Sequence, residues 1–114
     1  MAFEEVVTVP GDPQKYRLNV AVKRYALLDL GFVRNNAGAY VMERSLQPMK
    51  GLAKAIKLKV VVNQDLTGIK IKTVNPVGTA KVNIFNLADN GALLELYHYY
   101  LDELVTREIL QRVA

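Results

Sequence analysis

Five lysines recur in alternating phase along three apolar runs in the second half of the chain. They are Lys57, Lys59, Lys70, Lys72 and Lys81, interleaved with isoleucine, leucine and valine. Because successive side chains of a strand point to opposite faces, these lysines would gather on the side away from the core and form a positive patch. Such a patch either keeps an open sheet face soluble and unpaired, or it binds an acidic partner. The candidate partners are RNA, an acidic protein or an anionic small molecule.

Arg44 and Ser45 stand together at the end of another apolar run. A guanidinium group binds carboxylates and phosphates in a bidentate geometry, so Arg44, with Ser45 beside it, is a candidate ligand-binding residue. Ser45 is the single serine and His98 the single histidine. A nucleophilic serine needs a base, and only the fold could bring His98 to it. We therefore predict no catalytic residue.

Several classes of chemistry lack the residues that they require. The chain has no cysteine, which excludes disulfides, thiolate nucleophiles and cysteine-ligated metal sites. One histidine cannot make a two-histidine metal site, and no glycine-rich phosphate loop, dinucleotide fingerprint or nucleophile elbow is present. We predict no metal and no cofactor, and we leave open whether the protein is an enzyme, with the balance against it.

The lysines, Arg44 and Ser45 must be positioned by strands. Alternating apolar residues bounded by turn residues predict strands over 2–9, 16–20, 32–34, 39–46, 56–62, 69–74 and 81–85. The first two form a hairpin around the turn 10–13, and the next two form a hairpin around 35–38. The connections after residue 56 are too short for parallel crossovers, so an antiparallel meander is expected.

The last quarter of the chain changes to a helical period. A long helix is predicted from about residue 87 to 113, with Asn86 and Asp89 as signals for its start. Its core-facing residues are Leu93, Tyr97, Tyr100, Leu101 and Leu104. Tyr99 points to the polar side, where with Leu110 nearby in angle it could mark a partner contact. Glu108 falls at a core-facing angle, which indicates that the helix frays there or that a cation meets it.

Residues 21–30 fit a short helix, capped by Asn19 and ended by Gly31, and also fit an extended segment. We leave this choice open. The whole chain then reads as an α+β protein, with antiparallel strands in two sheets or one bent sheet, packed against one long C-terminal helix.

The chain has 114 residues and a formal net charge of +4. This length predicts one domain over 1–114 with a core of its own. No apolar run approaches the roughly 20 residues that span a bilayer, and the N-terminus lacks the pattern of a signal peptide. We expect a cytoplasmic protein that does not bind a membrane. The sequence does not predict an oligomeric state.

Four segments carry a resemblance to a small family of bacterial proteins of unknown function, labelled amino-acid metabolism. They are Leu30-Gly31-Phe32, Met42-Glu43-Arg44-Ser45-Leu46, Val82-Asn83-Ile84-Phe85 and the tyrosine-rich closing helix. The resemblance implies two sheets packed on one helix and favours an extended segment at 21–30. The family is remotely similar in shape to S-adenosylmethionine decarboxylases, but Arg44-Ser45 replaces the Glu–Ser pair of their self-cleavage site. The resemblance also implies genes near those for cysteine desulfurase and tRNA thiolation.

Three functions follow from these observations. The first is a non-catalytic accessory protein of amino-acid metabolism, which the gene neighbours extend to sulfur, whose Arg44 and lysines bind an anionic ligand or partner. The second is an RNA-associated module that acts with tRNA modification. The third is a small enzyme that uses Ser45 or His98.

Overall fold

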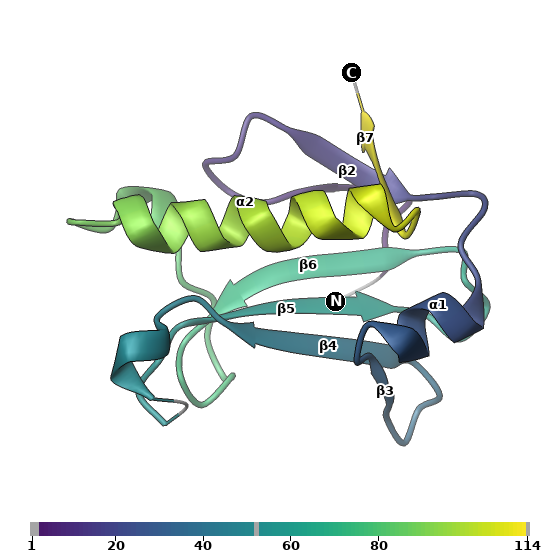
Figure 1. Cartoon of the computed structure of the whole chain (residues 1–114), viewed down its shortest axis with the longest axis horizontal. Coiled ribbons are helices and arrows are strands. Elements are labelled where there is room, and N and C mark those ends of the chain that lie inside the picture. The colour runs from purple at the N-terminus through teal and green to yellow at the C-terminus, as the bar shows by residue number, and fades with distance from the viewer. Residues whose placement is uncertain (1–2, 52, 114) are drawn as a thin grey trace.

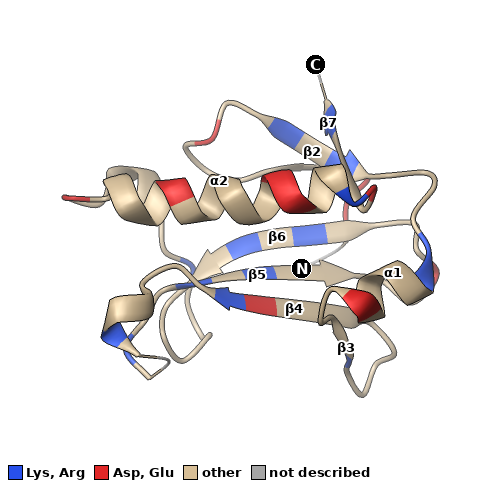
Figure 2. Ribbon diagram, in the orientation of Figure 1, with Lys and Arg blue, Asp and Glu red and all other residues tan. Residues whose placement is uncertain are grey.

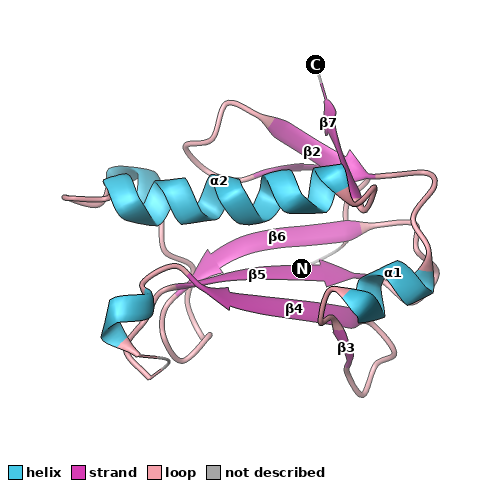
Figure 3. Ribbon diagram, in the orientation of Figure 1, coloured by secondary structure: helices cyan, strands magenta, loops and turns pink. Residues whose placement is uncertain are grey.

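The computed structural model describes residues 3–51 and 53–113 and contains two antiparallel sheets and one long helix (Figures 1 and 3). In chain order the elements are β1 (Val6–Thr8), β2 (Lys15–Leu18), α1 (Arg24–Asp29), β3 (Val33–Arg34), β4 (Tyr40–Ser45), the 3-10 helix η1 (Pro48–Lys50), β5 (Lys57–Val62), β6 (Ile69–Val74), the 3-10 helix η2 (Ile84–Asn86), α2 (Gly91–Thr106) and β7 (Leu110–Val113). The predicted α+β fold class is confirmed.

The larger sheet has the strand order β3-β4-β5-β6, and every neighbouring pair is antiparallel. Its tight turns use the residues that the sequence offers. In the β3–β4 hairpin the Asn35 side chain accepts hydrogen bonds from the amides of Ala37 and Ala39, and Gly38 adopts φ 83°. Asn63 closes the β5–β6 turn in the same way, through the amides of Thr67 and Gly68. The antiparallel connection predicted for 56–62 and 69–74 is confirmed by the pairing of β5 with β6, but the third strand of the predicted meander does not form.

The smaller sheet has the order β1-β2-β7, so the first hairpin of the chain pairs with its last strand. Glu4, just before β1, exchanges two backbone hydrogen bonds with Ile69 at the start of β6, at 3.1 and 3.0 Å. This single bridge joins the two sheets at one corner. The structure thus combines both predicted arrangements, because the sheets are separate along most of their length and joined at one point.

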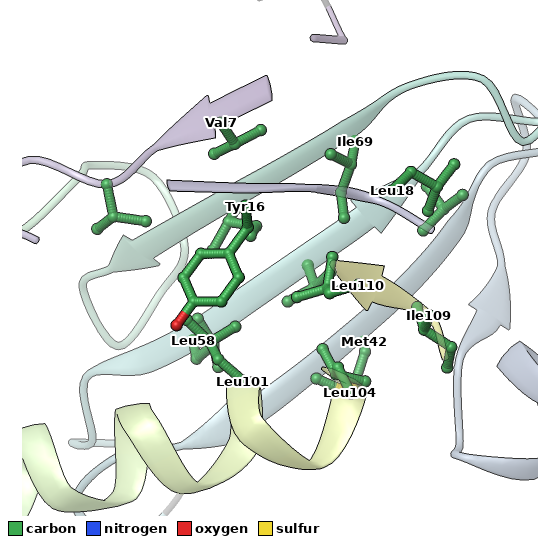
Figure 4. Packing of buried hydrophobic residues seen from close by; sticks show 14 of the residues in the cluster. Val7, Tyr16, Leu18, Met42, Leu58, Ile69, Leu101, Leu104, Ile109 and Leu110 are labelled. Atoms are coloured by element: carbon green, nitrogen blue, oxygen red, sulfur yellow. The ribbon is translucent and has the colours of Figure 1, made fainter. Parts of the chain in front are cut away.

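One core lies between α2 and the inner faces of both sheets (Figure 4). Helix α2 buries Leu93, Tyr97, Leu101 and Leu104, as predicted, and Tyr100 is partly buried at the edge of the core. The sheets contribute residues that include Tyr16, Leu18, Met42, Leu58, Val60, Ile69 and Leu110. Within the described residues, no helix is long and apolar enough to span a membrane.

The predicted strand over 81–85 is wrong. Lys81 makes one isolated bridge with Val74, and the Val82 amide donates to the Thr73 carbonyl at 2.8 Å. The chain then turns into η2, because the Asn83 side chain accepts a hydrogen bond from the Phe85 amide. The Phe85 ring packs against Tyr97 of α2, with ring centroids 5.7 Å apart.

The predicted helix over 87–113 is correct in its middle and wrong at both ends. It begins at Gly91, after Asn90, and neither Asn86 nor Asp89 caps it, since Asn86 lies in η2. It ends at Thr106, and the last residues form β7. Leu110, which we placed near Tyr99 on the helix surface, is fully buried in that strand.

The segment 21–30, left open by its sequence, contains the six-residue helix α1. Gly31 ends it with φ 93°, as the helical alternative predicted. The extended conformation favoured by the family resemblance is therefore wrong. Asn19 does not cap α1, because its side chain accepts from the Ala21 amide and closes a turn before the helix begins.

Candidate anion-binding face

Strands β5 and β6 place four lysines on one face of the larger sheet. Lys57, Lys59, Lys70 and Lys72 are partly exposed, while Leu58, Val60, Ile69, Ile71 and Thr73 alternate with them and are buried. Successive side chains of a strand point to opposite faces, so the residues between the lysines pack in the core while the lysines lie on the outer face. We call the surface formed by these four lysines the lysine face (Figure 2).

Two of these lysines are direct cross-strand neighbours. Lys59 pairs with Lys72 in the register of β5 and β6, and like charges at such positions repel. Burial and the charges of Lys59, Lys70 and Lys81 lower the pKa of Lys72. The centre of the lysine face is therefore a concentration of positive charge, maintained against a cost to the folded state.

Three acidic residues lie near this charge: Asp65 lines a hollow with Lys59, Lys70 and Lys72, Glu4 lines another with Lys70 and Lys72, and Glu43 is a cross-strand neighbour of Lys59. Glu43 on β4 stands opposite Lys59 in the register, but no ion pair joins them, and within the described residues none involves any lysine of the lysine face. Arg112 of β7 and Asp102 of α2 form an ion pair away from the lysine face. The lysine face thus remains available to an external anion.

The lysine face is hollowed. Lys59, Lys70 and Lys72 line a depression of about 430 Å³, bordered by the β3–β4 turn and the β5–β6 turn. The Phe3 ring forms part of its wall, with the Lys70 ammonium 4.4 Å from the ring centroid. A second hollow, of about 320 Å³, lies between β1 and β6 and shares Lys70 and Lys72 with the first. The sequence does not indicate this role of Phe3, because nothing near it predicts a contact with β6.

The other two predicted lysines stand at the margin of this charge. The Lys57 ammonium donates to the Pro76 carbonyl at 3.0 Å, which holds the loop after β6 against the sheet. Lys81 follows that loop and lines the second hollow, where its charge adds to that of Lys70 and Lys72.

Arg44 belongs to the opposite side of β4. It pairs with the buried Leu58, and its guanidinium group donates to the carbonyls of Leu30 at 2.6 Å and of Glu43 at 3.0 Å. Leu30 is the C-cap of α1, so Arg44 satisfies a free carbonyl at the end of that helix. Arg44 and Lys59 do line one shallow surface hollow, but the arginine's hydrogen bonds stabilise the fold.

The structure does not bring Ser45 and His98 together. Ser45 pairs with Lys57 and so faces the lysine side of the sheet, and its hydroxyl accepts from the Gln47 amide at 3.1 Å. His98 is on α2, which packs against the other side, and its ring contacts Phe85 and Tyr97. Among the described residues, no group of three or more histidine or acidic side chains could hold a metal ion.

Tyr99 is exposed, as predicted, and lines a groove of about 630 Å³ between η1 and α2. Lining residues from both walls include Pro48, Met49, Leu87, Leu96 and Tyr99. Of these residues the sequence indicated only Tyr99 as a contact, because the opposite wall of the groove comes from a loop more than forty residues earlier.

These features define a small α+β protein with one cationic sheet face and one apolar groove. Residues 1–111 match the model of the DUF1831 family, described as "Putative amino acid metabolism", and the chain belongs to that family. The crystal structure of a DUF1831 family protein from Lactobacillus plantarum is similar, with 41% sequence identity, 99% of both chains covered and a TM-score of 0.89. No curated protein matches the chain. The family resemblance drawn from the sequence is confirmed.

Proposed function

We propose that this protein is a non-catalytic binding protein of amino-acid metabolism, and that its lysine face binds an anionic small molecule. The observation that carries the proposal is the direct pairing of Lys59 with Lys72 without a neighbouring ion pair. The family description supports the metabolic setting. The separation of Ser45 from His98 on two sides of the sheet supports a role in binding.

A bound anion would reduce the electrostatic repulsion among the lysines of the lysine face. Lys59, Lys70 and Lys72 converge on the depression of about 430 Å³, whose size suits a small molecule and whose walls are turns and the Phe3 ring. Ammonium groups bind carboxylates and phosphates by charge-assisted hydrogen bonds. We therefore propose a ligand with two or more carboxylate or phosphate charges, since one charge cannot neutralise three lysines.

Titration with pyrophosphate and with citrate, followed by calorimetry, tests this proposal. The variant Lys59→Gln/Lys72→Gln removes the paired charges, and we expect it to weaken binding by at least about tenfold. The matched control is Lys23→Gln/Lys54→Gln, which removes two exposed lysines outside the lysine face and changes the net charge equally. If both variants weaken binding to the same extent, the effect is one of net charge and the proposed site is wrong.

The salt dependence of binding distinguishes a small anion from RNA. Single-stranded RNA would give a log–log salt slope of about −0.7 for each phosphate that is neutralised. Binding of RNA with a steep slope, in the absence of binding to either small anion, would replace this proposal with the RNA-associated function. The Phe85 ring packs against Tyr97 and His98 of α2, so among the residues that line the depression Phe3 is the aromatic side chain that could stack on a base.

A further inference from the structure

The groove between η1 and α2 exposes apolar side chains on both of its walls. Met49 on η1 is 98% exposed, and Tyr99 on α2 is 60% exposed. Leu87 and Leu96 lie in the same lining and are only partly covered by the core. Single exposed apolar residues are common on protein surfaces, but a groove with a projecting methionine on its rim indicates a contact surface.

The two walls of the groove carry opposite charges. Lys50 lies on the η1 wall, whereas Asp89 and Glu95 lie on the α2 wall. Figure 2 shows this polarity, with the basic residue on the short helix and acidic residues on α2 and on the loop before it. Lys50 and Glu95 form no ion pair within the chain.

A surface with this pattern is complementary to itself. In a two-fold dimer each contact occurs twice, so a patch that holds both a projecting residue and an apolar groove can supply both partners. The same holds for its charges when the two-fold axis runs along the groove, because this rotation brings the basic wall of one copy opposite the acidic wall of the other.

We propose that this groove is the interface of a homodimer, in which a second copy of the chain is the occupant. Met49 of each copy enters the apolar groove of the other, and Lys50 of each copy faces Glu95 of the other. Burial of Met49 and Tyr99 supplies the apolar centre of the interface, and the charged walls form its rim and set its register.

This inference is independent of the proposed function. The groove shares no lining residue with the hollows on the lysine face, so dimerisation would leave Lys59, Lys70 and Lys72 accessible. Anion binding and dimerisation can therefore each fail without the other.

Light scattering across a concentration series tests the dimer. We expect the wild-type mass to reach twice the 12.7 kDa of one chain. Met49→Glu should abolish dimerisation, because it places a charge in the apolar centre. Lys50→Glu and Glu95→Lys should each raise the dissociation constant by at least about tenfold, because each reversal puts two like-charge contacts into one dimer. The double reversal restores both pairs and should restore the dimer.

Val77→Glu provides the matched control for Met49→Glu. Val77 is 75% exposed in the loop after β6, outside the groove, so this substitution should leave the dimer unchanged. A wild-type chain that is monomeric up to about 0.5 mM would overturn the proposal, as would a dimer that tolerates Met49→Glu. A double reversal that stays monomeric would overturn the Lys50–Glu95 pairing and the two-fold arrangement with it.

Discussion

Asp12 is a buried carboxylate that ties the first hairpin to the long helix. Its Oδ2 accepts a hydrogen bond from the Tyr97 hydroxyl at 2.7 Å, and its Oδ1 accepts from the Gln14 amide at 2.9 Å. Both Asp12 and Tyr97 are buried, so each oxygen depends on a protein partner in place of water. The Tyr97 hydroxyl therefore links α2 to the turn of the first hairpin through one hydrogen bond.

Tyr97→Phe removes the hydroxyl and leaves the Asp12 carboxylate without its closest side-chain donor. We expect a loss of about 1–3 kcal/mol in the free energy of unfolding, because a buried acceptor loses its partner while the packing of the ring is kept. Urea denaturation measures the change. Tyr99→Phe removes the same hydroxyl from an exposed side chain and should change stability by no more than about 0.5 kcal/mol. Equal effects of the two substitutions would refute the role given to the Asp12–Tyr97 hydrogen bond.

The same tyrosine predicts a loss of stability at high pH. Burial, with the hydrogen bond and charge of Asp12, raises the pKa of Tyr97 far above its usual range. The folded protein therefore holds this proton more tightly than the unfolded chain, whose tyrosine titrates near pH 10. The resulting stabilisation is complete below pH ~10 and is lost at about 1.4 kcal/mol per pH unit above it.

Urea denaturation of the wild type and of Tyr97→Phe between pH 8 and 11 isolates this contribution. The difference in stability between them should be constant up to pH ~10 and then decrease, because the variant has no proton to lose at this position. Tyr16, whose pKa is also raised by burial, is present in both proteins and cancels. A difference that does not change over the whole range would contradict this prediction.

Single residues also show what the sequence could and could not reveal about the candidate site. The phase of Lys57, Lys59, Lys70 and Lys72 was predictable, because strand alternation alone decides which face a side chain takes. The Asx turn at Asp12 was predictable too, but its bond to Tyr97 joins residues 85 positions apart and has no local signal. The hydrogen bond from the Arg44 guanidinium to the Leu30 carbonyl has no local signal either, because it is made to the end of a helix whose existence the sequence left open.

At the scale of elements, the end of α2 is a Schellman motif without its usual glycine. The Ile109 amide donates to the Leu104 carbonyl at 2.9 Å, and the Glu108 amide donates to the Val105 carbonyl at 3.1 Å. Glu108 adopts φ 60°, a left-handed conformation that side chains other than glycine and asparagine rarely take. Helix α1 ends in the same motif, with Gly31 at the left-handed position. Glycine at this position indicates a helix end in the sequence and glutamate does not, so the end of α1 was predictable and the end of α2 was not.

Glu108→Gly should stabilise the protein by up to about 1 kcal/mol, because relief of the left-handed strain exceeds the added flexibility of the unfolded chain. The matched control is Glu103→Gly, an exposed position inside α2, which should cost about 1 kcal/mol through lost helix propensity. In thermal denaturation, the melting temperature should rise for Glu108→Gly and fall for Glu103→Gly. A destabilised Glu108→Gly would show that its side chain, and not the backbone strain, matters at the helix end.

The strands that the sequence predicted correctly are those whose pairing is local. The hairpins β1–β2 and β3–β4 and the β5–β6 pair are closed by turn residues such as Asn35 and Asn63, which leave a signal in the sequence. Strand β7 pairs with β2, more than ninety residues earlier, and its four residues continue a helical period. A long-range pairing of this kind has no local signature, so helix propensity determined the incorrect prediction.

At the scale of the whole molecule, the two sheets share one core, and we expect them to unfold as one cooperative unit. They are joined by the Glu4–Ile69 bridge and by a common core, in which Leu110 of β7 packs within the same cluster as Leu58 and Val60 of β5 (Figure 4). Neither sheet has a separate apolar core, because both present their inner faces to α2. Local opening of the smaller sheet would therefore expose the core of the larger one.

Leu110→Ala tests this cooperativity, because it shortens a fully buried side chain in the smaller sheet. We expect it to cost about 2–5 kcal/mol, from lost burial and the cavity left behind. Native-state hydrogen exchange measures the free energy of the opening that exposes each amide. This free energy should fall by the same amount for the Tyr16 amide in β2 and for the Val60 amide in β5, since one global opening exposes both. Val113→Ala, at the half-buried end of the same strand, should reduce stability less than Leu110→Ala does. It should still lower the opening free energy of both amides equally. A reduction confined to β2 and β7 would show instead that the smaller sheet opens on its own and that the bridge at Glu4 is a hinge between two units.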